Sequence, residues 1–399
     1  MNGYRFPEND ELLRKDEQVP LGEEPWKDLW PRAIWPGELA SSVPLALRIQ
    51  TDVGLARNEA GSTRFELRMP HEVALLAGTT LGNGIGAFAE TEWTREEGLE
   101  VGQAKVLFQD ILGLAPARAV NLWIGLQNLY PFTLADPEID RAARQTFRWQ
   151  TFRVADLLGS ASGLEAPGDS FALTASQPAI EVNGLAGGRL NYALGVSQGA
   201  GATTQDNNSR KDVYYRLRWK LGGLGLAGRY SKGAAPKDRG HGQLLDHSLT
   251  IEHFGYLGEE PTIGGAPDRH RHFGVAARVL LGPLDAGVGY VWGQFDDPWG
   301  AQSASGVTVR SAFAKVEVIA LPWLLPSFKV EHFDAEPESP EPGSQLPFER
   351  RTRLTPGIVA LLRPNLRAVL EAELVPRYEI GDSRVHRPTA TWLRLDLAF

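Results

Sequence analysis

The last residues of the chain, 391–399, alternate between apolar and polar side chains and stop on an aromatic residue. Because successive side chains of a strand point to opposite sides, one face would carry Leu393, Leu395 and Leu397 and the other Arg394 and Asp396. The same period of two begins just after residue 44 and recurs along the sequence. A chain with this pattern is expected to fold from strands.

The alternating segments are joined in turn by short turns and by longer polar loops. Most run about 9 to 14 residues, which suits tilted strands that cross a membrane. One glycine-rich stretch, 221–244, is interpreted as an extended turn, because counting it as a strand would make the total odd. The pattern predicts an all-β fold, a transmembrane antiparallel β-barrel of about 16 strands, with 14 or 18 as alternatives, short periplasmic turns and long extracellular loops. The strands are expected near 44–53, 72–80, 84–94, 103–111, 118–127, 176–183, 189–198, 211–220, 246–256, 272–281, 285–295, 307–320, 323–334, 351–362, 365–376 and 391–399.

The period of two does not say which face of each strand lies inside the closed sheet. A barrel of about 16 strands would enclose a lumen too wide for Ala, Val and Leu side chains to fill. We therefore expect the apolar face to contact lipid and the charged face to contact water. Aromatic residues near the strand ends would form the girdles of a membrane interface, and the candidates are Trp93, Phe108, Trp219, Tyr290, Trp292, Trp323, Phe328 and Phe399. In the alternative, a soluble all-β protein, they would be core residues.

Composition and the start of the chain narrow the remaining classes. The net charge is -8, and the 41 basic side chains form no block that would indicate nucleic acid binding. The chain has no cysteine, which forbids disulfides, thiolate metal sites and covalently attached c-type haem. Residues 1–42 show no period and are expected to form an irregular periplasmic arm, with the barrel in 43–399. The start has no apolar signal core, so an exported chain would be mature here or begin downstream of its true start.

Charged side chains lie opposite the apolar face on most of the expected strands. In a membrane barrel this face would line a water-filled lumen. Carboxylates two residues apart, such as Glu90 and Glu92, fit a lumen wall better than a catalytic pair. The pore-lining candidates are Glu90, Glu92, Lys105, Arg216, Arg218, Lys220, Lys315, Glu317, Lys329, Glu331, Arg367, Glu371, Glu373, Arg394 and Asp396.

The longest connection, 128–170, carries arginines at helical or near-helical spacing after Asp136, a residue suited to cap a short helix. One hypothesis is a loop folded into the lumen that narrows the pore and favours anions. Its constriction candidates are Arg141, Arg144 and Arg148. The competing interpretation, a solvated extracellular helix, accounts for the same spacing.

The sequence contains no motif for catalysis or for cofactor binding. There is no GxSxG or Walker loop, and the GNGIG run at 82–86 falls in an expected turn instead of ahead of a helix. The histidines have no metal-ligand spacing, and His270 and His272, where the expected loop meets the expected strand 272–281, are expected to be solvated. We therefore predict no enzymatic activity, no cofactor and no bound metal.

Two resemblances to known proteins extend this interpretation. A final strand that ends on an aromatic residue resembles bacterial outer-membrane barrels. Short stretches also resemble a group of such barrels found alongside multihaem c-type cytochromes: NGYRF at 2–6, FAETE at 88–92, VNLWIG at 120–125, DVYYRL at 212–217, KLGGL at 220–224 and FGYLG at 254–258. In that group the first stretch often follows a CxxCH haem attachment site. Here such a site either lies upstream of Met1 or is lacking.

The sequence supports several functional hypotheses. The first is a porin-like channel in the bacterial outer membrane, through which small polar solutes or ions diffuse passively. The second, implied by the resemblance, is a barrel sheath around a c-type cytochrome that carries electrons across the membrane. The third is a soluble all-β binding protein. The expected partners are outer-membrane lipid and small polar solutes or ions, with a c-type cytochrome and a homo-oligomer as open alternatives. The sequence specifies neither the solute nor the selectivity.

Overall fold

The computed structural model describes residues 45–57, 62–82, 84–95, 98–113, 118–129, 132–133, 146–154, 157, 171–199, 209–226, 246–261, 267–298, 306–338, 348–363, 365–381, 383–384 and 389–398, so the expected arm at 1–42 lies outside the described residues. Besides the short helix α3 (Arg148–Thr151), the described residues form seventeen strands. These are β1 (Leu45–Arg57), β2 (Thr63–Gly82), β3 (Ile85–Thr94), β4 (Gly98–Phe108), β5 (Asn121–Asn128), β6 (Ser176–Ala186), β7 (Leu190–Ser197), β8 (Asp212–Gly222), β9 (His247–Pro261), β10 (Pro267–Leu281), β11 (Leu284–Phe295), β12 (Val307–Val318), β13 (Leu324–Pro337), β14 (Glu349–Arg363), β15 (Leu366–Ile380), β16 (Ser383–Arg384) and β17 (Thr389–Ala398).

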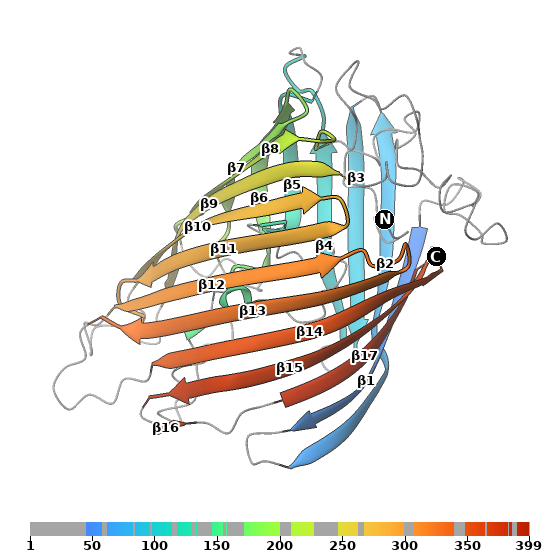
Figure 1. Cartoon of the computed structure of the whole chain (residues 1–399). Coiled ribbons are helices and arrows are strands. Elements are labelled where there is room, and N and C mark those ends of the chain that lie inside the picture. The colour runs from blue at the N-terminus through green and yellow to red at the C-terminus, as the bar shows by residue number, and fades with distance from the viewer. Residues whose placement is uncertain are drawn as a thin grey trace.

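The sheet closes on itself through its first and last strands. Gln50 of β1 lies opposite Glu72 of β2 on one side and opposite Asp396 of β17 on the other. Every other neighbouring pair is antiparallel and consecutive in sequence, apart from β15, which pairs with β17 as well as with the two-residue β16. Without β16, sixteen of the seventeen described strands form a closed antiparallel barrel (Figure 1). The predicted fold class and strand count are therefore confirmed.

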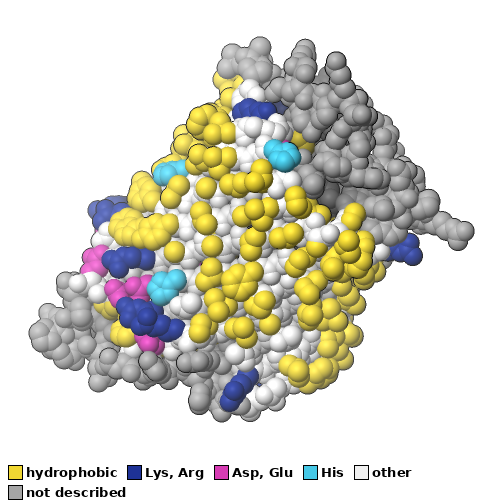
Figure 2. Space-filling view, viewed as in Figure 1, with side chains coloured by type: hydrophobic (Ala, Val, Ile, Leu, Met, Phe, Trp, Pro, Cys, Tyr) yellow, Lys and Arg dark blue, Asp and Glu magenta, His cyan; other side chains and the backbone are white. Residues whose placement is uncertain are grey.

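Apolar side chains face outward and charged side chains face inward. On β17, Leu393 and Leu395 are 41% and 38% exposed, whereas Asp396 between Leu395 and Leu397 is 0% exposed. Figure 2 shows apolar side chains spread over the outer face of the strands, with many of the charged ones gathered at its lower left. The expected orientation of the two faces is therefore the one found. Five of the expected girdle aromatics are exposed on this outer surface: Trp93, Trp219, Tyr290, Trp323 and Phe328.

Several strands extend beyond the expected ends, because the alternating signal fades where neither face contacts lipid. The clearest case is β2, which has 20 residues and continues through Pro70 into the region before the expected start at 72. The pairing of β1 with β2 shifts between Gln50 and Asp52, so Pro70 lies at a bulge. A bulge tolerates proline because the missing N–H is not needed for the ladder there.

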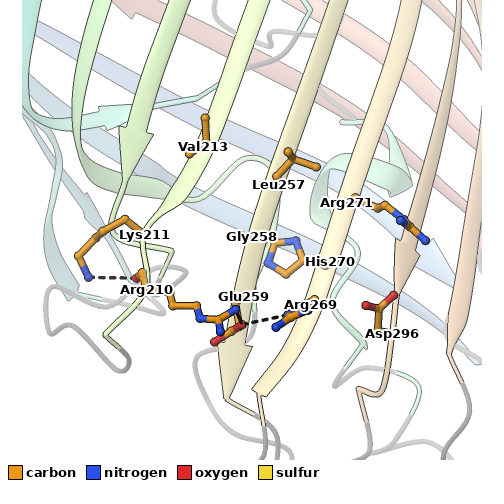
Figure 3. A pocket seen from close by; sticks show the side chains of 10 residues that line it. All are labelled: Arg210, Lys211, Val213, Leu257, Gly258, Glu259, Arg269, His270, Arg271 and Asp296. Atoms are coloured by element: carbon orange, nitrogen blue, oxygen red, sulfur yellow. Dashed lines mark hydrogen bonds and ion pairs between the residues drawn. The ribbon is translucent and has the colours of Figure 1, made fainter.

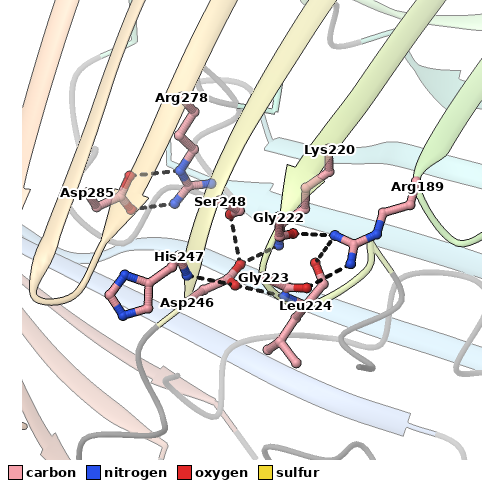
Figure 4. Close-up of polar contacts among 10 residues, drawn as sticks. All are labelled: Arg189, Lys220, Gly222, Gly223, Leu224, Asp246, His247, Ser248, Arg278 and Asp285. Atoms are coloured by element: carbon pink, nitrogen blue, oxygen red, sulfur yellow. Dashed lines mark hydrogen bonds and ion pairs between the residues drawn. The ribbon is translucent and has the colours of Figure 1, made fainter. Parts of the chain in front are cut away.

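The described start of the glycine-rich stretch after β8, up to Leu226, leaves the sheet in a turn, as expected, while residues 227–245 lie outside the described residues. Gly222 and Gly223 have left-handed backbone angles, with φ of 72° and 50°, and they turn the chain away from β8. Arg189 donates hydrogen bonds to the carbonyls of Gly222, Gly223 and Leu224 (Figure 4). Asp246 accepts a hydrogen bond from the Leu224 N–H at 2.8 Å. These contacts fix both ends of the connection, and β8 pairs directly with β9.

Candidate functional site: the barrel interior

The described part of the connection between β5 and β6, within 129–175, packs inside the barrel. Phe132 contacts Phe254 of β9 with ring centroids 5.0 Å apart, and Phe147 contacts Phe313 of β12 at 4.2 Å. Aromatic contacts of this kind contribute about 0.5–1.5 kcal/mol beyond the burial of area. We call this cluster the aromatic sector; it comprises Phe132, Phe147, Trp149, Phe152 and Phe171 from the connection and Phe254, Phe295, Phe313 and Phe333 from the wall.

Glycines on the inner wall make room for the rings of the aromatic sector. A Cβ atom on Gly289 would lie 2.2 Å from the Phe313 ring, and one on Gly274 would lie 2.3 Å from the Phe254 ring. Each ring therefore lies flat over the backbone of a neighbouring strand. This close approach explains part of the high glycine content of the chain, 43 residues.

Polar contacts fasten the same connection to the wall. The backbone N–H of Thr133 donates to Glu252 at 2.8 Å, and that of Phe171 donates to Glu260 at 2.8 Å. Arg148 donates from Nε and Nη2 to the two carboxylate oxygens of Glu349 at 3.0 and 2.9 Å. Of the constriction candidates, Arg148 is thus held inside the barrel against β14, while Arg141 and Arg144, like the expected helix after Asp136, lie outside the described residues.

A second part of the inner wall is lined by ion pairs that join neighbouring strands or, in one case, β13 to β15 across β14. We call it the ionic sector; it runs from β13 through β14, β15 and β17 to β1, β2 and β3. Its pairs are Arg353 with Glu331 at 2.9 Å, Lys329 with Glu371 at 3.5 Å, Arg351 with Glu373 at 2.8 Å, Arg367 with Asp396 at 2.7 Å, Arg394 with Asp52 at 2.8 Å and Arg48 with Glu72 at 2.6 Å.

The ionic sector crosses the line along which the barrel closes. Arg394 of β17 donates from Nε and Nη2 to both carboxylate oxygens of Asp52 of β1, at 2.8 and 3.0 Å. The Asp52 carboxylate is 0% exposed, so an arginine that satisfies both of its oxygens is needed to offset the loss of water. This one pair therefore fastens the last strand to the first and also keeps charge on the lumen wall.

All of the pore-lining candidates lie on the inward faces of their strands. Glu90, Glu92, Lys329, Glu331, Arg367, Glu371, Glu373, Arg394 and Asp396 belong to the ionic sector, where Glu90 and Glu92 lie 3.7 and 3.4 Å from Arg48. The others come from β4, β8 and β12: Lys105, Arg216, Arg218, Lys220, Lys315 and Glu317. Arg216 pairs with Glu181 at 2.6 Å and Lys220 with Asp246 at 2.5 Å.

Sequence reasoning was wrong about two histidines and missed the aromatic sector. His270 and His272 lie on β10, not in a loop, and are only 3% and 4% exposed beneath Phe171. An indication was available in the inward positions of β9 and β10, which mix aromatic, acidic and histidine side chains instead of carrying charges alone. Within the described ranges, no group of three His, Cys, Asp or Glu residues could hold a metal ion. Among the same residues, no helix has the length and apolar character to cross a membrane.

Comparisons with known proteins agree with this architecture. No protein-family model and no curated protein sequence matches the chain. Among solved structures, an anion-selective porin from Comamonas acidovorans is 13% identical with a TM-score of 0.60, over 90% of this chain and 99% of that one. The outer-membrane channel DcaP of Acinetobacter baumannii is 10% identical with a TM-score of 0.61, over 90% and 97%. Salmonella typhi OmpF, in complex with daunomycin, is 10% identical with a TM-score of 0.56, over 89% and 97%. The chain therefore has the fold of outer-membrane porins.

Proposed function

We propose that this protein is a channel of the bacterial outer membrane through which small polar solutes or ions diffuse passively. The observation that carries the proposal is the ionic sector, a wall of charged side chains of both signs on the inner face of a closed barrel whose outer face is apolar. The charged side chains of such a wall offer polar contacts in place of some of those that a solute loses when it leaves bulk water. The fold, shared with an anion-selective porin and an outer-membrane channel, supports the same proposal.

In this proposal the pore-lining candidates form the solute path, and the connection between β5 and β6 narrows it. The aromatic sector and the Arg148–Glu349 pair hold the connection against one part of the wall, and Arg353 of the ionic sector donates to the Thr146 carbonyl of the same connection. The rest of the ionic sector is left to line the path. Arg141, Arg144 and Arg148 remain the proposed constriction residues. Their positive charges would raise the local concentration of anions.

Conductance in planar lipid bilayers tests the channel. The full chain, extracted with detergent, is expected to insert and give discrete conductance steps, and its band in electrophoresis should shift on boiling, as closed barrels do. Insertion without any conductance would contradict the proposal. Extraction in water without detergent would instead support the soluble alternative.

Reversal potentials test the constriction. Arg144→Gln and Arg148→Gln are expected to shift the reversal potential in a salt gradient toward cation preference. Arg310→Gln serves as the control because Arg310 points outward, away from the lumen. Unchanged potentials in both loop variants would remove the constriction from the proposal. A cytochrome sheath would need the lumen space that the connection occupies, which counts against this alternative. A haem protein that co-purifies with the barrel, together with a blocked pore, would nevertheless favour it.

A further inference from the structure

A groove of about 400 Å³ opens on the outer surface at the ends of β8, β9, β10 and β11 that lie farthest from the Asp246 connection (Figure 3). We call it the rim groove. Val213 and Leu257 form its apolar part, and both are lipid-facing residues, 43% and 51% exposed. Its charged part consists of Arg210, Lys211, Glu259, Arg269, Arg271 and Asp296.

The charged part of the rim groove carries an excess of positive charge. Four cations against two carboxylates leave two positive charges, on a chain whose net charge is -8. Glu259 lies between Arg210 at 2.5 Å and Arg269 at 3.5 Å, and it holds the two guanidinium groups on either side of itself. The arginines stay accessible, with 55% and 64% of their side chains exposed. Glu259 therefore brings the two arginines close together while much of each side chain stays open to a ligand.

The rim groove lies where the outer surface changes from apolar to charged. The outward position passes from Val213 of β8 to Lys211 just before that strand, and on β9 from Leu257 to Glu259. Each change takes two residues, about 7 Å along a strand. On β10 the guanidinium of Arg271 lies 5.9 Å from the ring of Trp292, an aromatic residue of the kind that marks a membrane interface. The cations are thus placed at the depth of lipid headgroups.

A second charged group at the same rim lacks this excess. On β12, β13 and β14, Arg310 pairs with Glu336 at 3.7 Å and Arg350 pairs with Asp334 at 3.1 Å. With Arg377 and Glu379 of the neighbouring β15, which lie 3.0 Å apart, three arginines there face three carboxylates. Positive charge in excess is therefore a property of the rim groove and not of the rim of β12–β14.

We propose that the rim groove binds a phosphorylated lipid of the outer leaflet, because it lies at the end of the barrel where most connections between strands, such as 296–306 and 338–348, are the longer ones. The phosphate is placed among Arg210, Lys211, Arg269 and Arg271, and the acyl chains lie along Val213 and Leu257. Arginine pairs suit phosphate because their forked N–H groups match its oxygens. The inference rests on the proposed membrane location, since the groove meets lipid only if the outward apolar face does.

Binding of diphosphorylated lipid A to the full chain in detergent, titrated by native mass spectrometry, tests the inference. Dephosphorylated lipid A and inorganic phosphate are the comparison ligands. The double variant Arg269→Gln with Arg271→Gln is expected to bind diphosphorylated lipid A about tenfold more weakly than wild type. The matched control, Arg310→Gln with Arg350→Gln, removes the same charge from the balanced group and is expected to stay within about twofold.

Three results would overturn the inference: equal binding of phosphorylated and dephosphorylated lipid A, an equal loss in both double variants, or binding of inorganic phosphate as tight as that of the lipid. The last result would make the groove a site for free phosphate. Conductance of the wild-type protein in bilayers without lipid A separates this inference from the channel. A protein that conducts but shows no phosphate preference loses only the rim groove proposal.

Discussion

The barrel lumen is too wide for side chains from opposite walls to pack against one another. The aromatic sector and the ionic sector provide contacts for the inward side chains in two different ways. In the aromatic sector a segment of the chain itself covers the wall, and the rings of Phe147 and Phe313 exclude water. In the ionic sector charged side chains such as Arg394 and Asp52 satisfy one another across strands. The comparison teaches that stability of the first depends on shape and area, whereas stability of the second depends on charge balance.

The largest expected effect comes from removing a ring of the aromatic sector. Phe313→Ala leaves a cavity beside Phe147 and should lower the free energy of unfolding by about 3–5 kcal/mol. Because the connection also loses its anchor, conductance should become noisier. Unfolding in guanidinium, followed by the heat-dependent shift in electrophoresis, gives the first quantity, and single-channel recording gives the second.

Val288→Ala is the control for this change. Val288 lies on β11 and is 56% exposed on the outer face, so it touches lipid and not the connection. It should cost far less than Phe313→Ala and leave the noise unchanged. Equal losses in the two variants would show that the rings do not hold the connection, and the contrast between the sectors would fail.

A smaller effect is expected from one ion pair of the ionic sector. Arg394→Gln removes the arginine that donates to both oxygens of the Asp52 carboxylate, and it should lower the free energy of unfolding by about 1–3 kcal/mol. It should also shift the reversal potential toward cations, since a positive charge is lost from the lumen wall.

Charge balance is tested by adding Asp52→Asn to Arg394→Gln. The double variant restores neutrality and should be more stable than Arg394→Gln alone, with a reversal potential close to wild type. Additive losses would show that the pair acts through packing alone, which would remove the distinction drawn between the sectors.

The sequence predicted the ionic sector better than the aromatic sector, for a physical reason. Charges opposite lipid-facing residues repeat every second position, so Arg394 and Asp396 could be placed on the inner face from the pattern alone. Partners such as Arg353 and Glu331 come from different strands, and their pairing depends on register, which the pattern does not specify. The aromatic sector depends on a connection with no period, and residues such as Trp149 carry no signal of where a loop folds.

Strand ends show the same limit. At the ends of β9 and β10 the outward positions carry charged residues, Glu259 and Arg269. Both faces are polar there, so apolar and polar residues no longer alternate. The strands continue to pair where the sequence alternation has ended, because backbone hydrogen bonds depend on the neighbouring strand and not on the side chains. The gap left between the expected strands 246–256 and 272–281 was therefore too long, and the rim groove could not have been found from the sequence.

The smallest expected effect concerns Asp246, which directly precedes β9 and pairs with Lys220 of β8. Burial acts to raise the pKa of this carboxyl group, but hydrogen bonds from Lys220 and from the Leu224 N–H outweigh it and hold the pKa below the ordinary value of 3.8. The ionised group therefore stabilises the fold above pH 3.8, and this contribution is lost as the pH falls through the lower value of the folded chain.

Asp246→Asn should consequently lower the unfolding midpoint slightly at pH 7, and the difference from wild type should shrink as the pH falls below 3.8. The neighbouring His247→Gln, a change at an exposed side chain, is the control and should show no such convergence. Because Asp246 pairs with Lys220, a pore-lining candidate outside the ionic sector, its neutralisation should shift the reversal potential less than Arg394→Gln does. A shift as large as that of Arg394→Gln would extend the ionic sector to β8 and redraw the boundary between the two parts of the wall.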